Sequence, residues 1–205
     1  MGNTVLMRGE TVTAFTQELF QKAGMSEPDA KYHAECLVNT NYWGIDSHGV
    51  IRVPAYFKRM LNGAINTNPQ IKVVRGEGCL EVLDVDAAAG FIGGRAGMER
   101  AMDHAAVSGI AACGVINSNH FGAGALYARM AAERGMIGIA MTNVKTSDCG
   151  SGSQCSGDRK QSHCLRHPYI RRIPICAGYV PFRGGRRQAY PGNQEEGKDS
   201  YGLGN

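Results

Sequence analysis

The spacing of apolar residues changes near residue 70, and that change constrains the fold most strongly. Before residue 62, apolar side chains recur at helical intervals, as Val12, Phe15 and Leu19 do. After residue 71, short runs alternate between apolar and polar residues, which is typical of strands. The sequence therefore predicts a helical region at 1–70 and an α/β region at 71–147.

Three helices are expected in the first region. One covers residues 10–23. A second runs over 27–41, because Ser26 and Asp29 have the spacing of a helix-capping pair. A third covers 54–61. The polar segment GIDSHGVIR must then join the second helix to the third.

Strands and helices alternate in the second region. IKVV and CLEVLDVD are expected to form a hairpin, and residues 91–107 a helix. A strand, a helix and a second strand are then expected at IAACGVIN, AGALYARMAAER and MIGIAMTN, respectively. This order is the βαβ pattern of a parallel sheet. An α/β fold with a mixed sheet follows. The break SNHFG would lie after a strand, where open α/β sheets place ligand sites.

Two polar segments carry the candidate site. GIDSHGVIR contains Ser47, His48 and Arg52, and SNHFG contains His120. An imidazole exchanges a proton near neutral pH, and a guanidinium holds a carboxylate through two hydrogen bonds, which suits a 2-hydroxy or 2-oxo acid. A polar turn and a lone structural histidine are the alternative interpretations.

Charge and composition disfavour several other functions. Residues 1–147 carry equal numbers of basic and acidic residues, so the net charge of +4 comes from the tail and no nucleic-acid partner is expected. No apolar run has the length of a membrane span or the form of a secretory signal, which predicts a cytoplasmic protein away from membranes. The glycines at 90–97 depart from G-x-G-x-x-G and are expected to allow close helix packing.

Two segments resemble the malate/L-lactate dehydrogenase family, which includes ureidoglycolate and sulfolactate dehydrogenases. They are GIDSHGVIRVPAYFKRMLNGAI and INSNHFGAGALYARMAAERGMIGIAMTN. The resemblance covers about residues 8–147. It implies a non-Rossmann fold, NAD or NADP as cofactor, a small 2-hydroxy or 2-oxo acid as substrate, and a homodimer. Residues 1–70 would carry the substrate site, and 71–147 would form part of a cofactor domain.

The resemblance also implies roles for single residues. His48 and His120 would be the catalytic imidazoles, one of which moves a proton while hydride passes between substrate and nicotinamide. Arg52 would bind the substrate carboxylate, with Ser47 as a hydrogen-bond partner. No metal ligand is expected in this site.

Asn143 and Val144 fall where relatives meet the cofactor. Many relatives carry Ser or Thr at the position of Val144, so this residue departs from the family pattern. Trp43 is a second departure, because relatives often have Arg there.

The resemblance stops soon after Thr146. When residues 157–204 are back-translated and read one nucleotide later, permitted codons give GTENNPIAYAIPTSEEYPFVLDM and then GKLTLAIKKKEKIPMGWA, which resemble the family's continuation. A frameshift near residue 148 is therefore expected, with an out-of-frame, disordered tail at 148–205, a fold incomplete at its C-terminus, an unpaired sheet edge and uncovered apolar surface.

Other interpretations concern the tail. The printed chain could be a catalytically inactive, truncated fragment of such an enzyme. The basic residues of the tail could bind nucleic acid, although stacking aromatic residues are not interleaved with them. The tail could also bind zinc, although its cysteines lack the usual close pairs; the candidate ligands are Cys149, Cys155, His163, Cys164, His167 and Cys176.

Overall fold

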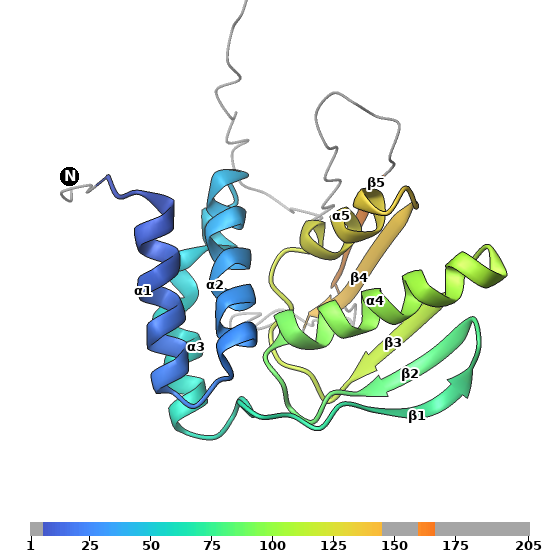
Figure 1. The fold of residues 1–205 in the computed structure, drawn as a ribbon, viewed down its shortest axis with the longest axis horizontal. Helices are drawn as coiled ribbons and strands as arrows, with labels where there is room; N and C mark the ends of the chain where they lie inside the picture. Colours follow the sequence, from blue (N-terminus) through green and yellow to red (C-terminus); the bar gives the residue numbers. More distant parts are fainter. Residues whose placement is uncertain (1–5, 145–159, 167–205) are drawn as a thin grey trace, which may run out of the picture.

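The computed structural model describes residues 6–144 and 160–166 (Figure 1). Three helices form the N-terminal region and lie together on the left of Figure 1, and the strands lie with the other two helices on the right. The expected helices are present, with ends shifted by a residue or so. They are α1 (Gly9–Lys22), α2 (Glu27–Tyr42) and α3 (Val53–Leu61).

The start of α2 shows why its boundary could be predicted. The side chain of Ser26 accepts a hydrogen bond from the backbone N–H of Asp29 at 3.4 Å, and a proline occupies the first helical turn. These residues satisfy or remove N–H groups that no helical carbonyl can reach.

The hairpin and the next strand form a three-stranded mixed sheet. Strand β1 (Lys72–Glu77) pairs antiparallel with β2 (Leu80–Asp84), and β2 pairs parallel with β3 (Ala112–Ile116). Helix α4 (Gly90–Ser108) connects β2 to β3 and packs on one face of the sheet (Figure 1). The fold is thus α/β with a βαβ unit.

The βαβ unit differs from the expected one. The sequence suggested that β3, α5 (Ala125–Glu133) and β4 (Gly138–Val144) form it, but the parallel pair lies across α4. Among the described residues, β4 pairs with β5 (Lys160–Arg166) in an antiparallel manner and not with β3. The positive φ angles of Asn117 (53°) and Gly122 (75°) turn the chain after β3, so it reaches α3 before α5 begins.

Strand β5 also modifies the expectation of a disordered tail. It lies within 148–205, and its backbone pairs with every residue of β4. Strand pairing uses backbone N–H and C=O groups, so β4 and β5 can pair without a particular pattern of side chains. The remainder of the expected tail lies outside the described residues.

One apolar core joins the helices to the sheet. Phe20 and Leu37 of the helical region and Phe91 of α4 belong to the same cluster, and all three are fully buried. Arg95 of α4 pairs with Asp29 of α2 at 2.6 Å, at the edge of this core. These contacts set the position of the helices relative to the ends of the strands.

The glycines of α4 permit close packing, as expected. A Cβ atom at Gly94 would overlap the ring of Tyr127 on α5, and one at Gly97 would lie 2.7 Å from a methyl group of Val115 on β3. Helix α4 therefore approaches both neighbours more closely than a larger residue would allow.

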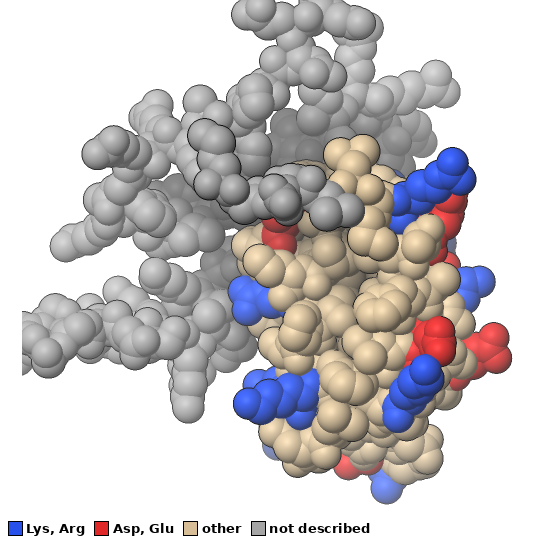
Figure 2. Space-filling model, turned by 90° about the vertical axis from the view of Figure 1, so that its left-hand side faces the viewer, with Lys and Arg blue, Asp and Glu red and all other residues tan. Residues whose placement is uncertain are grey.

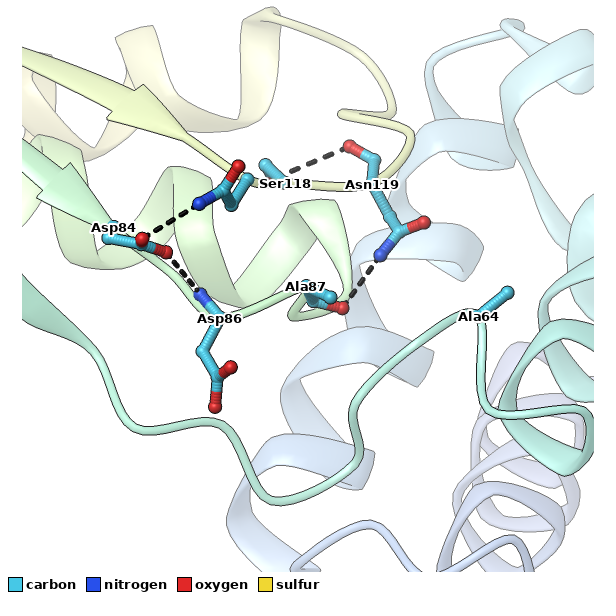
Figure 3. Close-up of a pocket in the computed structure, with 7 residues that line it drawn as sticks. Ala64, Asp84, Asp86, Ala87, Ser118 and Asn119 are labelled. Carbon is cyan, nitrogen blue, oxygen red and sulfur yellow. Dashed lines mark hydrogen bonds between the residues drawn. The ribbon is translucent and has the colours of Figure 1, made fainter.

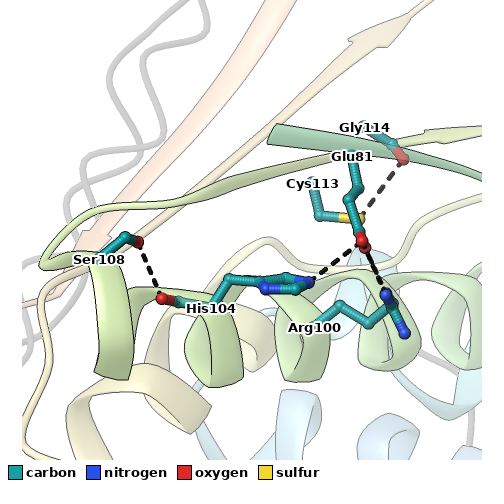
Figure 4. A network of polar contacts seen from close by, with 6 residues as sticks. All are labelled: Glu81, Arg100, His104, Ser108, Cys113 and Gly114. Carbon is teal, nitrogen blue, oxygen red and sulfur yellow. Dashed lines mark hydrogen bonds and ion pairs between the residues drawn. The ribbon is translucent and has the colours of Figure 1, made fainter. Parts of the chain in front are cut away.

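A buried carboxylate fastens α4 to the sheet (Figure 4). Glu81 of β2 is 5% exposed. Arg100 donates two hydrogen bonds to it, and Nε2 of His104 lies 3.1 Å from it. The hydrogen bonds from Arg100 lower the pKa of Glu81, so the carboxylate stays charged at neutral pH.

Several apolar side chains of the strands are exposed. Ile139 and Met141 of β4 are 55% and 62% exposed, and Leu80 of β2 is 62% exposed. On the α1 side of the molecule, separate basic and acidic groups surround a largely uncharged surface (Figure 2).

Candidate active site

The segment GIDSHGVIR forms two short 3-10 turns between α2 and α3. The first covers Asp46–His48 and the second Val50–Arg52. The side chain of Asn41, near the end of α2, binds both turns: its oxygen accepts from the N–H of Val50 at 2.7 Å, and its nitrogen donates to Asp46 at 2.5 Å. The segment is therefore held against α2.

Two contacts within the segment orient its functional side chains. The hydroxyl oxygen of Ser47 lies 2.9 Å from Nδ1 of His48. Nε of Arg52 donates to the backbone carbonyl of Ser47 at 2.7 Å. The Nδ1 contact leaves Nε2 of His48 available to a ligand, because a neutral imidazole can donate at one nitrogen and accept at the other.

His120 reaches the same place from the loop after β3. Its ring is stacked on that of His48, with centroids 5.5 Å apart and planes inclined by 24°. The hydroxyl of Tyr56, on α3, lies 2.6 Å from Nδ1 of His120. The structure thus brings both predicted histidines together, with Ser47 and Arg52 beside them.

Both imidazoles are neutral at physiological pH. Burial lowers the pKa of His120 to about 4, with further contributions from His48, Arg52 and Arg59. Burial, followed by the charge of Arg52, also lowers the pKa of His48. A pair of neutral rings beside guanidinium groups can accept a proton once an anion binds and offsets the positive charge.

Sequence reasoning missed three residues of this site. Tyr56 contacts His120 as described, and Arg59 donates to the side-chain oxygen of Asn119 at 2.6 Å. The amide nitrogen of Asn119 donates to the carbonyls of Ala87 and Ala88 at 2.7 and 3.1 Å. A signal was present in the sequence, because Arg52, Tyr56 and Arg59 follow each other at helical spacing from the second 3-10 turn into α3.

A cavity of about 400 Å³ lies beside Asn119, at the carboxyl ends of β2 and β3 (Figure 3). Its carboxylates are bound to neighbouring groups: Asp84 accepts from the side chain of Asn117 at 2.7 Å and from the backbone N–H of Asp86 at 2.9 Å. The acidic lining disfavours an anion there. The residues lining the cavity are Ala64, Asp84, Asp86, Ala87, Asn117, Ser118 and Asn119.

The predicted cofactor residues lie at the end of a strand. Asn143 and Val144 are the last residues of β4, where they pair with Gln161 and Lys160. Only their backbone is described, and their roles stay predictions.

Within residues 6–142, whose side chains the structure describes, no three His, Cys, Asp or Glu side chains are placed to share a metal ion. No helix in the same part of the chain is long and apolar enough to cross a membrane. The tail residues Cys149, Cys155, His167 and Cys176 of the zinc hypothesis lie outside the described residues.

Curated proteins with similar sequences are dehydrogenases. Malate dehydrogenase of Pyrococcus abyssi is 40% identical over 143 residues, which are 70% of this chain and 40% of that protein. L-sulfolactate dehydrogenase of Methanocaldococcus jannaschii is 33% identical over 69% of this chain and 41% of its own length. Ureidoglycolate dehydrogenase (NAD(+)) of Escherichia coli K12 is 34% identical over 64% and 38%. The chain thus spans about 40% of the length of these relatives.

Solved structures of dehydrogenases are also similar to this chain. Malate dehydrogenase from Pyrococcus horikoshii matches with a TM-score of 0.75 and 33% identity, over 80% of this chain and 47% of that one. Malate dehydrogenase from Entamoeba histolytica matches with a TM-score of 0.77 and 28% identity, over 86% and 49%. The family model described as malate/L-lactate dehydrogenase matches residues 7–154. This chain therefore belongs to the malate/L-lactate dehydrogenase family.

Proposed function

We propose that this chain provides the acid-binding and proton-exchanging side of an NAD(P)-dependent oxidoreductase. The reaction transfers hydride between a nicotinamide cofactor and a small 2-hydroxy or 2-oxo acid. The stacking of His48 on His120, with centroids 5.5 Å apart, carries this proposal. Two imidazoles from distant segments meet beside a guanidinium, which suits an acid that loses or gains a proton at its hydroxyl oxygen.

Hydroxyl groups hold both rings through Nδ1. Tyr56 contacts His120 at 2.6 Å, and Ser47 contacts His48 at 2.9 Å. A hydroxyl can donate or accept, so each contact persists whether Nδ1 carries a proton or not. His48 can therefore take the substrate's hydroxyl proton at Nε2 during oxidation and return it during reduction. Nδ1 of His120 accepts from the backbone N–H of Gly122 at 3.3 Å, so the neutral His120 ring carries its proton on Nε2, from which it can donate a hydrogen bond to the substrate oxygen.

Arg52 is proposed to bind the carboxylate beside the reacting carbon. Its Nε is already bound to the carbonyl of Ser47, which orients the two terminal nitrogens of the guanidinium. Such a planar group matches a carboxylate with two parallel hydrogen bonds. The carboxylate would then place the reacting carbon and its oxygen near the imidazoles.

A nicotinamide cofactor fits this donor set. None of the histidine, tyrosine, serine or arginine side chains of the site exchanges hydride, so a bound nicotinamide would supply or accept it. Asn143 and Val144 are proposed to hold the cofactor at the end of β4. One relative carries NAD(+) in its name, which supports NAD for this chain, and NADP is the alternative.

Cofactor oxidation tests the proposal. Two proteins would be compared: the 205-residue chain printed above, and a continued chain in which the sequence after about residue 148 is read in the family's reading frame. Each would be mixed with NADH or NADPH and with oxaloacetate, pyruvate or another small 2-oxo acid, and the absorbance of the reduced cofactor would be followed. We expect the continued chain to oxidise the cofactor, and we expect this oxidation to be lost in a His48→Ala, His120→Ala double variant. A continued chain inactive with every acid and both cofactors would overturn the enzyme proposal.

An inactive fragment is the second candidate. The chain spans about 40% of its relatives' length, and Ile139 and Met141 expose an apolar face of β4. Such surface is normally covered in a complete fold. Activity in the continued chain but not in the printed one would support this candidate, and activity in both would exclude it. Sequencing the DNA across codons 140–160 would test the frameshift directly.

A homodimer is also proposed. Phe15 of α1, Tyr42 of α2 and Leu61 of α3 are 64%, 71% and 64% exposed. A second copy covering such side chains would remove apolar surface from water. Sedimentation of the continued chain should show twice the monomer mass, and a monomer at micromolar concentration would contradict the proposal.

A further inference from the structure

A second guanidinium lies beside the imidazole pair. Arg52 ends the second 3-10 turn, and Tyr56 and Arg59 follow on α3 at intervals of four and three residues, which place the three on one side of the helix. Each contacts one of the two histidine-bearing segments: Arg52 binds Ser47, Tyr56 binds His120, and Arg59 binds Asn119. Arg52 and Arg59 both help to lower the pKa of His120, so both charges act on that ring.

No described carboxylate pairs with either arginine. The ion pairs within 6–142 involve other residues, and the carboxylates of Asp46 and Asp86 accept hydrogen bonds from neutral amide groups. Asp46 accepts from Asn41, and Asp86 accepts from the side chain of Asn66 at 2.9 Å. The site therefore presents two positive charges to a ligand, while both imidazoles are neutral.

The position of Arg59 is fixed before any ligand binds. Its partner Asn119 is anchored through two backbone carbonyls, those of Ala87 and Ala88. Asn119 also directly precedes His120 in the chain, so the Arg59 guanidinium is held close to the His120 imidazole. A charge held in this way binds an anion with little loss of conformational freedom.

We propose that Arg59 binds a second acidic group of the substrate, so that the site selects diacids over monoacids. The inference rests on the proposed function, because it assumes that Arg52 takes the carboxylate next to the reacting carbon. The second group would be a carboxylate or sulfonate on the same small 2-hydroxy or 2-oxo acid. Two guanidiniums for two anionic groups leave no charge unpaired when the ligand is bound.

Ligand binding by the 205-residue chain tests the inference without any hydride transfer. Imidazole NMR signals of His48 and His120 would be followed during titration with malate, a diacid, and with lactate, a monoacid. The parent chain should bind malate more tightly. Arg59→Gln should weaken malate binding by about tenfold or more, the value of a charge-assisted hydrogen bond, and should change lactate binding little.

Two further variants separate charge recognition from a structural effect. Lys58→Gln removes the same charge from the neighbouring exposed position of α3 and should leave the malate preference unchanged. Arg59→Lys should restore part of that preference. Equal loss of malate and lactate binding in Arg59→Gln would show that Arg59 merely supports the loop of Asn119, and would overturn the inference.

The two proposals fail in different ways. If malate and lactate bind the parent chain equally, Arg59 is not a selective residue, although cofactor oxidation by the continued chain can still support the enzyme. If binding shows the expected preference but the continued chain oxidises no cofactor, the acid site stands and hydride transfer does not. If neither acid shifts the histidine signals, both the inference and the acid site are overturned.

Discussion

The hydroxyl of Tyr56 lies 2.6 Å from Nδ1 of His120, across 64 positions of the sequence. This contact joins α3 to the loop after β3. Burial raises the pKa of Tyr56 to about 12, so the hydroxyl keeps its proton at every physiological pH and can donate it to the ring. Tyr56 therefore holds His120 where His48 can stack on it, together with the backbone N–H of Gly122, which donates to the same Nδ1 at 3.3 Å.

Tyr56→Phe should loosen the His120 ring without opening the core. The ring of the phenylalanine can keep the packing of Tyr56, and one hydrogen bond is lost at a cost of about 1 kcal/mol of unfolding free energy. Chemical denaturation would measure that cost. Nitrogen NMR should show altered tautomer populations for His120 and much smaller changes for His48. Equal changes in both rings would contradict the interpretation that Tyr56 supports His120 in particular.

His33→Phe should stabilise the protein at pH 7. His33 is fully buried, both ring nitrogens lack a described hydrogen-bond partner, and its neighbours are the rings of Phe20, Tyr56 and Phe91. Removing an unsatisfied buried polar group should gain about 1–3 kcal/mol. His33→Gln, which keeps polar atoms in the same place, is the matched control and should not stabilise.

The same histidine should make stability depend on pH. Burial lowers the pKa of His33 to about 3, below its ordinary value of 6.5, so the unfolded chain binds the proton more readily. Stability is then complete above pH 6.5 and falls as the pH drops toward 3, by about 2 kcal/mol between pH 7 and pH 5. Denaturant midpoints at the two pH values would show the loss, and a loss of the same size in His33→Phe would assign it to other groups.

Gly97→Ala should destabilise the contact between α4 and the sheet. The added Cβ would lie 2.7 Å from Val115, so the helix or the strand must move, at a cost of about 1–3 kcal/mol. Gly114→Ala is the control, because its Cβ would meet Val82 at an ordinary 3.5 Å. Thermal unfolding of both variants provides the measurement, and similar melting temperatures would argue against tight packing at Gly97.

Arg52→Gln should weaken binding of both lactate and malate. The substitution removes the charge proposed to hold the carboxylate that every substrate shares, and a loss of about tenfold or more is expected for each acid. Titration of the histidine signals would report it. Loss of malate binding alone would place the shared carboxylate on another residue.

The local features of the fold could be predicted from the sequence because they depend on residues close together in the chain. The Ser26 cap, the helical period before residue 62 and the hairpin after Ile71 are set by contacts over a few positions. The strand partners were harder, since β3 and β4 each have a suitable pattern and periodicity does not specify which edges pair. The parallel pair therefore lies across α4 rather than α5.

The sequence by itself determined which chemical groups are present: two histidines in polar segments, an arginine at helical spacing from one of them, and family motifs around both. Only the tertiary structure decided that His48 and His120 stack, that Tyr56 supports one ring, and that Arg59 lies beside Asn119. The physical reason is that these contacts join segments far apart in the chain. Their geometry depends on how a shared core docks α3 against the ends of the strands, and no local pattern encodes that docking.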